Sequence, residues 1–513
     1  MIDGKILIEK LLLYARTFLG LAELDVIYLR NTLLTEFNLS APIKNAKNIS
    51  YVTELDVPDE LINEIIAYAL ENKIASSEVD AELFANYVMG LLSPRPSEVN
   101  RTFNSLLENV DEQEACNYLY NLSTKNYYIR QTAISKNVKW VADELKIPLD
   151  ITINLSKPEK NNKDIAKVLT AKHTNKYPEC ALCKENEGFY GHATQPARSN
   201  LRTVKTVLGD ETWYMQYSPY LYFNEHCILF NSAHVPMKID GDTVQKLFDF
   251  IEMFPNYFIG SNADLPIVGG SILNHEHYQG GKFEMPLHKT KAFRTYKSKK
   301  YTDVSVEVLD FYNSVIRICG FNRDSVQSLA TDIIEAWKGY SDETVGIVAN
   351  VDGVRHNTVT PIVRFLEGKK YCIELILRNN SISSEYPEGV FHAHPEYHNI
   401  KKEGIGLIEA MGLFVLPARL ERQFGEISKI LSKQIPYDET VCAEGSDLFV
   451  HKNMIEKLLN KYPNIKDENK ANLVIREYVN KVCAEILINT AVFKRDKHGI
   501  SAFNKFLASV EIK

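Results

Sequence analysis

The residues with the clearest chemical potential lie in one short stretch, residues 266–284, with the sequence PIVGGSILNHEHYQGGKFE. An apolar run rich in β-branched residues leads into His275, His277 and Gln279, and glycines close it, which predicts a strand. Alternate side chains of a strand share one face, so these three are expected on the same side. One imidazole can attack phosphorus, the other can bind a metal, and the amide can donate to a phosphate oxygen. The alternative is a half-exposed strand with two ordinary histidines.

A pair of cysteines, Cys180 and Cys183, lies in a turn-rich loop further upstream. The C-x-x-C spacing places two thiolates within reach of one metal ion. A Gly-containing loop follows the pair, so the sequence does not favour a thioredoxin-like redox motif. A closed zinc site needs two more ligands, and His226, His234 and His275 are the candidates. The alternative is a cysteine pair without metal and histidines in the core.

Two arginines, Arg198 and Arg202, lie between the cysteines and the histidine strand. If they face the same way, they can clamp a diphosphate with bidentate hydrogen bonds. An ordinary pair of surface arginines is the competing interpretation.

The composition excludes several classes of protein. The chain has 513 residues, enough for two or more cores, and its 45% hydrophobic and 24% charged content is typical of globular proteins. A net charge of −7 without a basic block argues against nucleic-acid binding. No apolar run approaches the roughly 18 residues of a membrane helix, and the N-terminus predicts an amphipathic helix instead of a signal peptide. Eight scattered cysteines indicate thiol or metal use, and we expect a cytoplasmic protein.

The histidine strand resembles the active-site strand of galactose-1-phosphate uridylyltransferases, a branch of the histidine-triad superfamily in which Gln replaces the third His. Prolines usually surround the histidines in that family, whereas Glu276 and Tyr278 separate them here. This departure is typical of the divergent second class of the family. The resemblance covers about residues 170–430.

The resemblance also selects among the candidate metal ligands. In the family, the first His of the strand and a His just before an apolar–Pro pair complete the site. It therefore implies a structural zinc, held in a closed Cys₂His₂ site by Cys180, Cys183, His234 and His275. His226 is expected to pack in the core or to make a structural hydrogen bond. A second H-x-H, His392 and His394, resembles the family's second metal site. No further ligand matches securely, so that metal is left open.

Substrate-binding residues follow from the resemblance as well. Small polar residues before the strand are expected to hold nucleotide phosphates, the arginine region to contact uridine and phosphate, and residues 401–409 to recognise a hexose. The residues implied are Arg198, Arg202, Ser261, Asn262, Ser271, Lys402 and Glu409.

The implied reaction is uridylyl transfer from UDP-glucose to galactose 1-phosphate. His277 would attack the α-phosphorus and form a covalent uridylyl-imidazole, and Gln279 would donate to a non-bridging oxygen. A glutamine cannot act as an acid, which favours transfer over hydrolysis. The alternatives are another histidine-triad-like nucleotidyltransferase, a dinucleoside polyphosphate phosphorylase, or a zinc-stabilised nucleotide-binding protein without turnover.

The expected fold class is α+β, with a duplicated histidine-triad-like antiparallel sheet or half-barrel as its core. Helical regions are expected at both ends of the chain, and a homodimer is compatible with the resemblance. We predict four parts: a helical region 1–150, a first unit 151–300 with the cysteines and the nucleophile, a second unit 301–435 on the hexose side, and a helical region 436–513.

Overall fold

The computed structural model describes the whole chain except residues 1, 45, 157–176, 193–194, 271 and 439. Ser271 and the helix expected to end near His173 lie outside the described residues. The chain divides into two compact units, one formed by residues 1–136 and 160–235 and the other by 137–159 and 236–513. The four-part division predicted from the sequence stays a prediction.

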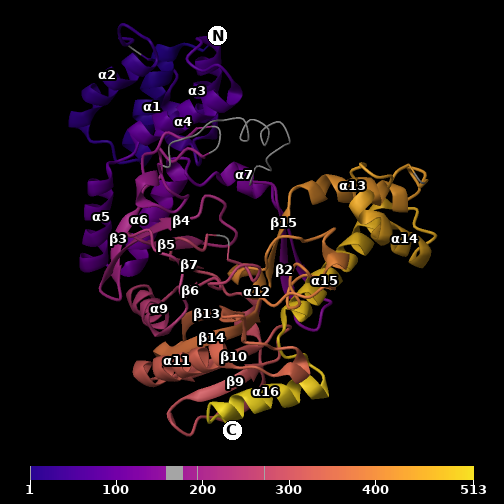
Figure 1. The fold of residues 1–513 in the computed structure, drawn as a ribbon. Coiled ribbons are helices and arrows are strands. Elements are labelled where there is room, and N and C mark those ends of the chain that lie inside the picture. The colour runs from indigo at the N-terminus through magenta and orange to yellow at the C-terminus, as the bar shows by residue number, and fades with distance from the viewer. Residues whose placement is uncertain (1, 45, 157–176, 193–194, 271, 439) are drawn as a thin grey trace. The chain divides into compact units, whose positions relative to one another are not determined.

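Helices dominate the first unit, as the sequence predicts for its beginning. α1 begins where the Asp3 side chain accepts hydrogen bonds from the first free backbone N–H groups, and its apolar residues return every three or four positions and are buried. Figure 1 shows α1 to α4 gathered as one indigo and violet group. The helices are α1 (Gly4–Phe18), α2 (Val26–Glu36), α3 (Asp59–Glu71), α4 (Glu78–Leu92), α5 (Pro96–Asn109), α6 (Glu112–Lys125) and α7 (Gln131–Ser135).

A short antiparallel sheet completes this unit. It consists of β3 (Val204–Leu208), β4 (Glu211–Tyr217) and β5 (Cys227–Asn231). Residues of β3 alternate between buried and exposed positions, as expected for a strand with one face on the core. α5 contacts β3 and α6 contacts β4, so these helices cover the sheet.

The second unit contains a longer antiparallel sheet with the strand order β7-β6-β13-β14-β10-β9-β8. Helices α9 and α11 contact each other and the central strands. Every residue of β10 is buried, as are the last eight of β14. The elements are α9 (Gly241–Met253), β6 (Phe258–Gly260), β7 (His277–Gly281), α10 (Pro286–Lys289), β8 (Ala292–Lys297), β9 (Ser305–Leu309), β10 (Val315–Gly320), α11 (Arg323–Gly339), β13 (Asn357–Leu366) and β14 (Lys370–Asn379).

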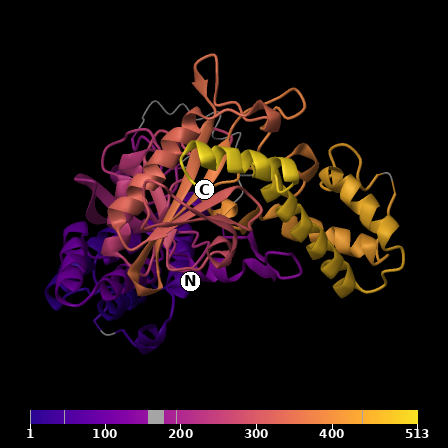
Figure 2. The same cartoon turned by 90° about the horizontal axis from the view of Figure 1, so that it is seen from below.

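The remaining elements of this unit form a small sheet, a hairpin and the C-terminal helices. β2 pairs with β1 and, in parallel, with β15. Helices α13, α14 and α15 pack together and form the orange and yellow group in Figure 2. The bounds are β1 (Val138–Ala142), β2 (Leu149–Asn154), β11 (Asn350–Val351), β12 (Val354–Arg355), α12 (Leu407–Ala410), β15 (Leu413–Pro417), α13 (Arg419–Leu431), α14 (Lys452–Lys461), α15 (Glu468–Thr490) and α16 (Lys497–Ser509).

The predicted α+β class, with antiparallel sheets and helical regions at both ends, is confirmed. Among the described residues, no helix has both the length and the apolar character needed to cross a bilayer.

Candidate active site

The nucleophile candidate His277 is the first residue of β7, and Gln279 follows two positions later on the same strand. Gln279 lies opposite Gly260 of the neighbouring strand β6. The sequence predicts that His275 also belongs to the strand, which is wrong: residues 273–275 form a turn and a bend. Only His277 and Gln279 therefore share a strand face by alternation.

A backbone contact fixes the protonation state of His277. Its Nδ1 lies 2.8 Å from the carbonyl oxygen of His275, which can only accept, so Nδ1 carries the proton. The lone pair of Nε2 is then available for attack. Burial lowers the pKa of His277 to about 4, so the ring is neutral at pH 7. The imidazole thus has the tautomer that nucleophilic attack requires.

The lowered pKa of His277 predicts how its reactivity depends on pH. Protonation of Nε2 removes the attacking lone pair, and the folded protein resists this until the pH approaches 4. The rate of covalent labelling of zinc-loaded protein should therefore be flat between about pH 7.5 and 5.5 and fall only at lower pH. Rapid-quench labelling across this range measures it. A midpoint near pH 6.5 would show an unshifted histidine and contradict the prediction.

The opposite face of the strand carries a buried polar network. The Glu276 carboxylate accepts hydrogen bonds from Lys246 Nζ at 3.1 and 3.3 Å and from the Tyr278 hydroxyl at 2.8 Å. Lys246 belongs to α9, and all three residues are buried. The two residues that separate the site's side chains, where the resembling family has prolines, thus attach the nucleophile strand to a helix.

This network predicts a clear stability effect. Glu276→Gln removes the charge that balances buried Lys246, so it should lower the free energy of unfolding by roughly 3 kcal/mol. Tyr278→Phe removes one hydrogen bond from a carboxylate that keeps its lysine, and should cost only about 1 kcal/mol. Urea unfolding of both variants measures the difference. Equal, small losses would mean that the Lys246–Glu276 pair does not hold the strand.

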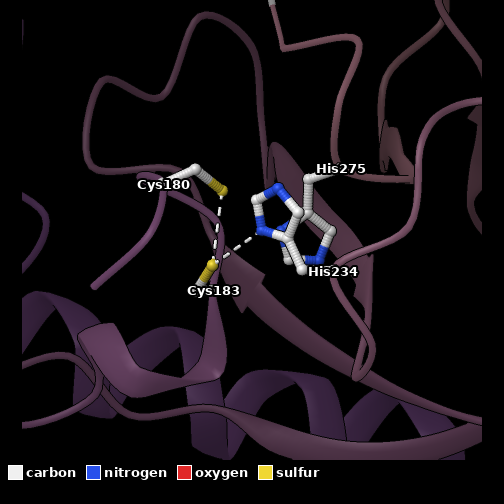
Figure 3. A group of neighbouring side chains, drawn as sticks. All are labelled: Cys180, Cys183, His234 and His275. Atoms are coloured by element: carbon white, nitrogen blue, oxygen red, sulfur yellow. Dashed lines mark hydrogen bonds between the residues drawn. The ribbon is translucent and has the colours of Figure 1, made fainter. Parts of the chain in front are cut away.

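Cys180, Cys183, His234 and His275 lie together, as shown in Figure 3, and one ligand atom from each lies within 4.8 Å of the others. The two sulfur atoms are 3.5 Å apart, and Cys183 Sγ is 3.2 Å from His234 Nδ1. A tetrahedral zinc with Zn–S bonds of about 2.3 Å separates its sulfur ligands by about 3.8 Å. The group is therefore close to the spacing of a Cys₂His₂ zinc site.

The chemistry of these ligands also fits zinc. Burial raises the pKa of the Cys183 thiol to about 11, so the group holds its proton unless a cation displaces it. Nε2 of His234, the ring nitrogen that stays free when Nδ1 binds a metal, has the Glu179 carboxylate 3.7 Å away. His226, the ligand candidate that the resemblance excluded, instead packs against Tyr222 and Phe223.

The two arginines have different environments. Arg202 is buried, and its guanidinium donates to five backbone carbonyls, among them Gly90 at 2.9 Å and Pro94 at 2.6 Å. These bonds join the loop to the end of α4, so Arg202 is structural and does not pair with Arg198 as a phosphate clamp. Arg198 is half-buried, lies over the ring of Tyr128 at 5.7 Å, and donates to one carbonyl. It stays a candidate for substrate binding.

The candidates near the hexose loop are partly brought together. The backbone N–H of Leu407 donates to Asn262 Oδ1 at 2.8 Å, which joins the residues after β6 to the loop at 404–409. Ser261 is buried beside it, and its hydroxyl donates to the Asn262 carbonyl at 3.0 Å. Glu409 lies in α12, and its side chain has little solvent contact.

The lysine of this region that pairs with Glu409 is Lys401, while the substrate-binding role of Lys402 stays a prediction. Lys402 is exposed and faces Glu388 at 3.4 Å, whereas the preceding Lys401 is buried and donates to Glu409 Oε1 at 3.0 Å. The sequence offers two adjacent lysines, and only the structure shows which of them points inward.

Among the described residues, the second H-x-H is not joined by a third metal-ligating side chain. Nε2 of His392 accepts from the Ile405 N–H at 3.4 Å, and Nε2 of His394 lies 3.1 Å from the Val390 carbonyl. Burial, and in addition the positive charge of the Arg378 guanidinium, lower the pKa of His392 to about 4. The same charge would repel a metal cation at His392. In the described part of the chain, the group around Cys180 is the single cluster of three or more metal-ligating side chains.

Comparisons with known proteins match the chain to the family that the histidine strand resembles. The family model described as galactose-1-phosphate uridyl transferase, N-terminal domain, matches residues 23–236. A galactose-1-phosphate uridylyltransferase from Caldanaerobacter subterraneus is 43% identical over 100% of this chain and 99% of its own length. Those from Clostridium acetobutylicum and Streptococcus mutans are 43% and 39% identical over 98% and 96% of both chains.

The chain belongs to this family. The galactose-1-phosphate uridylyltransferase family is the one that the histidine strand predicts. The predicted family and its class of enzyme, a nucleotidyltransferase, are therefore confirmed. A solved structure, that of yeast Ap4A phosphorylase, aligns with 65% of the present chain and 92% of the yeast chain at 10% sequence identity. Its TM-score of 0.29 is too low to support an argument.

Proposed function

We propose that the protein transfers a uridylyl group from UDP-glucose to galactose 1-phosphate in two steps. The observation that carries the proposal is the geometry of His277, a neutral imidazole whose proton is held on Nδ1 by a backbone carbonyl. The names of relatives that match over the full chain support galactose 1-phosphate as the acceptor and the uridylyl group as the group transferred.

In the first step, His277 Nε2 attacks the α-phosphorus of UDP-glucose. The N–P bond forms, the bond from phosphorus to the bridging oxygen breaks, and glucose 1-phosphate leaves. The ring becomes positively charged in this adduct, and its Nδ1–H still donates to the His275 carbonyl, which stabilises that charge. Gln279 donates to a non-bridging oxygen and cannot exchange a proton with the phosphate.

In the second step, a phosphate oxygen of galactose 1-phosphate attacks the same phosphorus. The P–N bond breaks, UDP-galactose leaves, and His277 returns to its neutral form. Glu409 accepts from hexose hydroxyls, with Lys401 holding its carboxylate in place. Arg198, Asn262 and Ser261 are the proposed contacts to the nucleotide phosphates.

A bound zinc would cross-link the chain through Cys180, Cys183, His234 and His275 without taking part in the reaction, because four protein ligands leave no open position. His275 is two residues from the nucleophile, and its carbonyl orients the nucleophile's ring. Fixing this residue therefore fixes the attacking nitrogen. A cytoplasmic location belongs to the proposal, and the eight free cysteines support it.

Isotope exchange tests the two-step course. Labelled glucose 1-phosphate should enter UDP-glucose in the absence of galactose 1-phosphate, because the first step is complete and reversible without the acceptor. Exchange that requires galactose 1-phosphate would contradict the covalent intermediate. Exchange with ATP and adenylyl products, but none with UDP-glucose, would move the assignment to an adenylyl-transferring relative.

A further inference from the structure

A buried arginine without a role in the proposed chemistry lies behind the hexose loop. Arg378 is near the end of β14 and is 1% exposed. Its Nη2 donates to the Ile405 carbonyl at 3.0 Å, while its buried Nε and Nη1 have no hydrogen-bond partner among the described residues. Burial lowers the pKa of this guanidinium to about 10, so it stays charged at pH 7. A buried charge with unsatisfied donors is destabilising, so Arg378 does not serve mainly to stabilise the fold.

Ile405, the partner of Arg378, is held from its other side by His392. The Ile405 N–H donates to His392 Nε2 at 3.4 Å, so this ring is neutral and has its proton on Nδ1. The amide and the carbonyl of one buried residue are therefore both bound by side chains from outside the loop.

Two further contacts hold the same loop. The Leu407 N–H donates to Asn262 Oδ1 at 2.8 Å. Gly269, at a φ of +101°, approaches Ile405 and Gly406 so closely that a Cβ there would collide with their backbone. The loop at 404–409 is thus fixed at successive residues up to Glu409, whose Oε2 lies 3.6 Å from the position of a Cβ on Gly406.

We infer that Arg378 is a positioning residue for hexose recognition: it holds the Ile405 carbonyl, so that the loop presents Glu409 to the sugar. The inference rests on the proposed function, because it takes Glu409 as the group that meets the hexose. In this inference Arg378 acts through its hydrogen bond to the Ile405 carbonyl and not through contact with the substrate. Its charge and its planar donors suit this task better than a neutral side chain would.

The test separates the two half-reactions. UDP-glucose is held by its uridine and diphosphate as well as by its sugar, whereas galactose 1-phosphate depends more on the hexose loop. Arg378→Met should therefore raise the KM for galactose 1-phosphate about tenfold, while the rate of protein labelling by saturating UDP-glucose changes less than about threefold. Arg378→Lys keeps a charge and a donor, and should recover most of the wild-type KM.

Arg317→Lys is the matched control. Arg317 is also a buried arginine of this sheet, but it pairs with Glu374 and donates to the carbonyls of Thr290 and Leu287, not to the loop. The Arg317→Lys variant should leave the KM for galactose 1-phosphate unchanged. If Arg378→Met does not fold, His392→Ala, which releases the other side of Ile405, must raise the same KM.

An unchanged KM in Arg378→Met, or an equal loss in both half-reactions, would overturn the inference. Absence of labelling in the wild-type protein would instead overturn the proposed function, so the two failures are distinguishable.

Discussion

Replacing His277 by alanine is expected to lower kcat/KM by at least about 10⁴-fold, since it removes the atom that forms the bond to phosphorus. The side chain is buried at the start of β7, and its ring forms no ion pair with any other described residue, so its loss leaves no charge unbalanced. The fold should therefore persist, and zinc content and the unfolding midpoint of the variant check that it does. Steady-state assays of UDP-galactose formation measure the loss.

Gln279→Ala is the matched comparison for this variant. Gln279 lies two residues further along the same strand, and its substitution removes the proposed donor to phosphate while leaving His277 intact. Its turnover should fall by only about 10²- to 10³-fold, and the protein should still form the covalent adduct. Residual turnover of His277→Ala at the level of Gln279→Ala would mean that another group is the nucleophile.

Loss of the metal is the second large effect. Cys183→Ser should reduce zinc from one equivalent per chain to a small fraction of that and lower the midpoint of thermal unfolding by about 10 °C. The physical reason is that a buried serine cannot replace a thiolate ligand, and the remaining three ligand groups then lie close together without a cation. Elemental analysis and calorimetry give the two readouts.

Cys116→Ala is the control for the metal. Cys116 is a buried cysteine of the same unit that does not belong to the metal cluster, so its substitution should leave the zinc content at one equivalent. A full zinc content in Cys183→Ser would contradict the Cys₂His₂ assignment. Two equivalents of zinc in the wild-type protein would contradict the expectation of a single site at Cys180, Cys183, His234 and His275.

The sequence predicts those parts of the site in which residue type and local spacing determine the chemistry. Cys180 and Cys183 are three positions apart, and His277 and Gln279 are two positions apart on a strand, so each pair is together by local geometry alone. His234 and His275 come from distant positions, and the family resemblance selects them. The structure agrees, since all four ligand atoms gather.

Burial and side-chain direction could not be predicted in the same way. Arg198 and Arg202 look equivalent in the sequence, but the guanidinium N–H groups of Arg202 donate to backbone carbonyls. Arg378 has no distinctive neighbours in its strand, and its significance comes from contact with Ile405, 27 residues away along the chain.

Several strands were also missed or misplaced by sequence reasoning. The sequence predicts a basic linker at 289–300, but this segment contains β8, a largely exposed edge strand that includes Arg294 and Lys297. The sequence also predicts a strand at 345–351, but within that range only Asn350–Val351 is a strand, paired with Val354–Arg355 in a short hairpin. The fully buried β10 has no alternation of polar and apolar residues to mark it.

The most direct test of the account is a trapping experiment on the covalent intermediate. The protein is incubated with UDP-glucose labelled in its α-phosphate, without an acceptor, and the label is followed on the denatured protein. We expect acid-labile label on the wild-type chain, its release by galactose 1-phosphate as UDP-galactose, and none on His277→Ala. Label that persists on His277→Ala, or a wild-type protein that turns over without ever becoming labelled, would contradict the uridylyl-histidine mechanism.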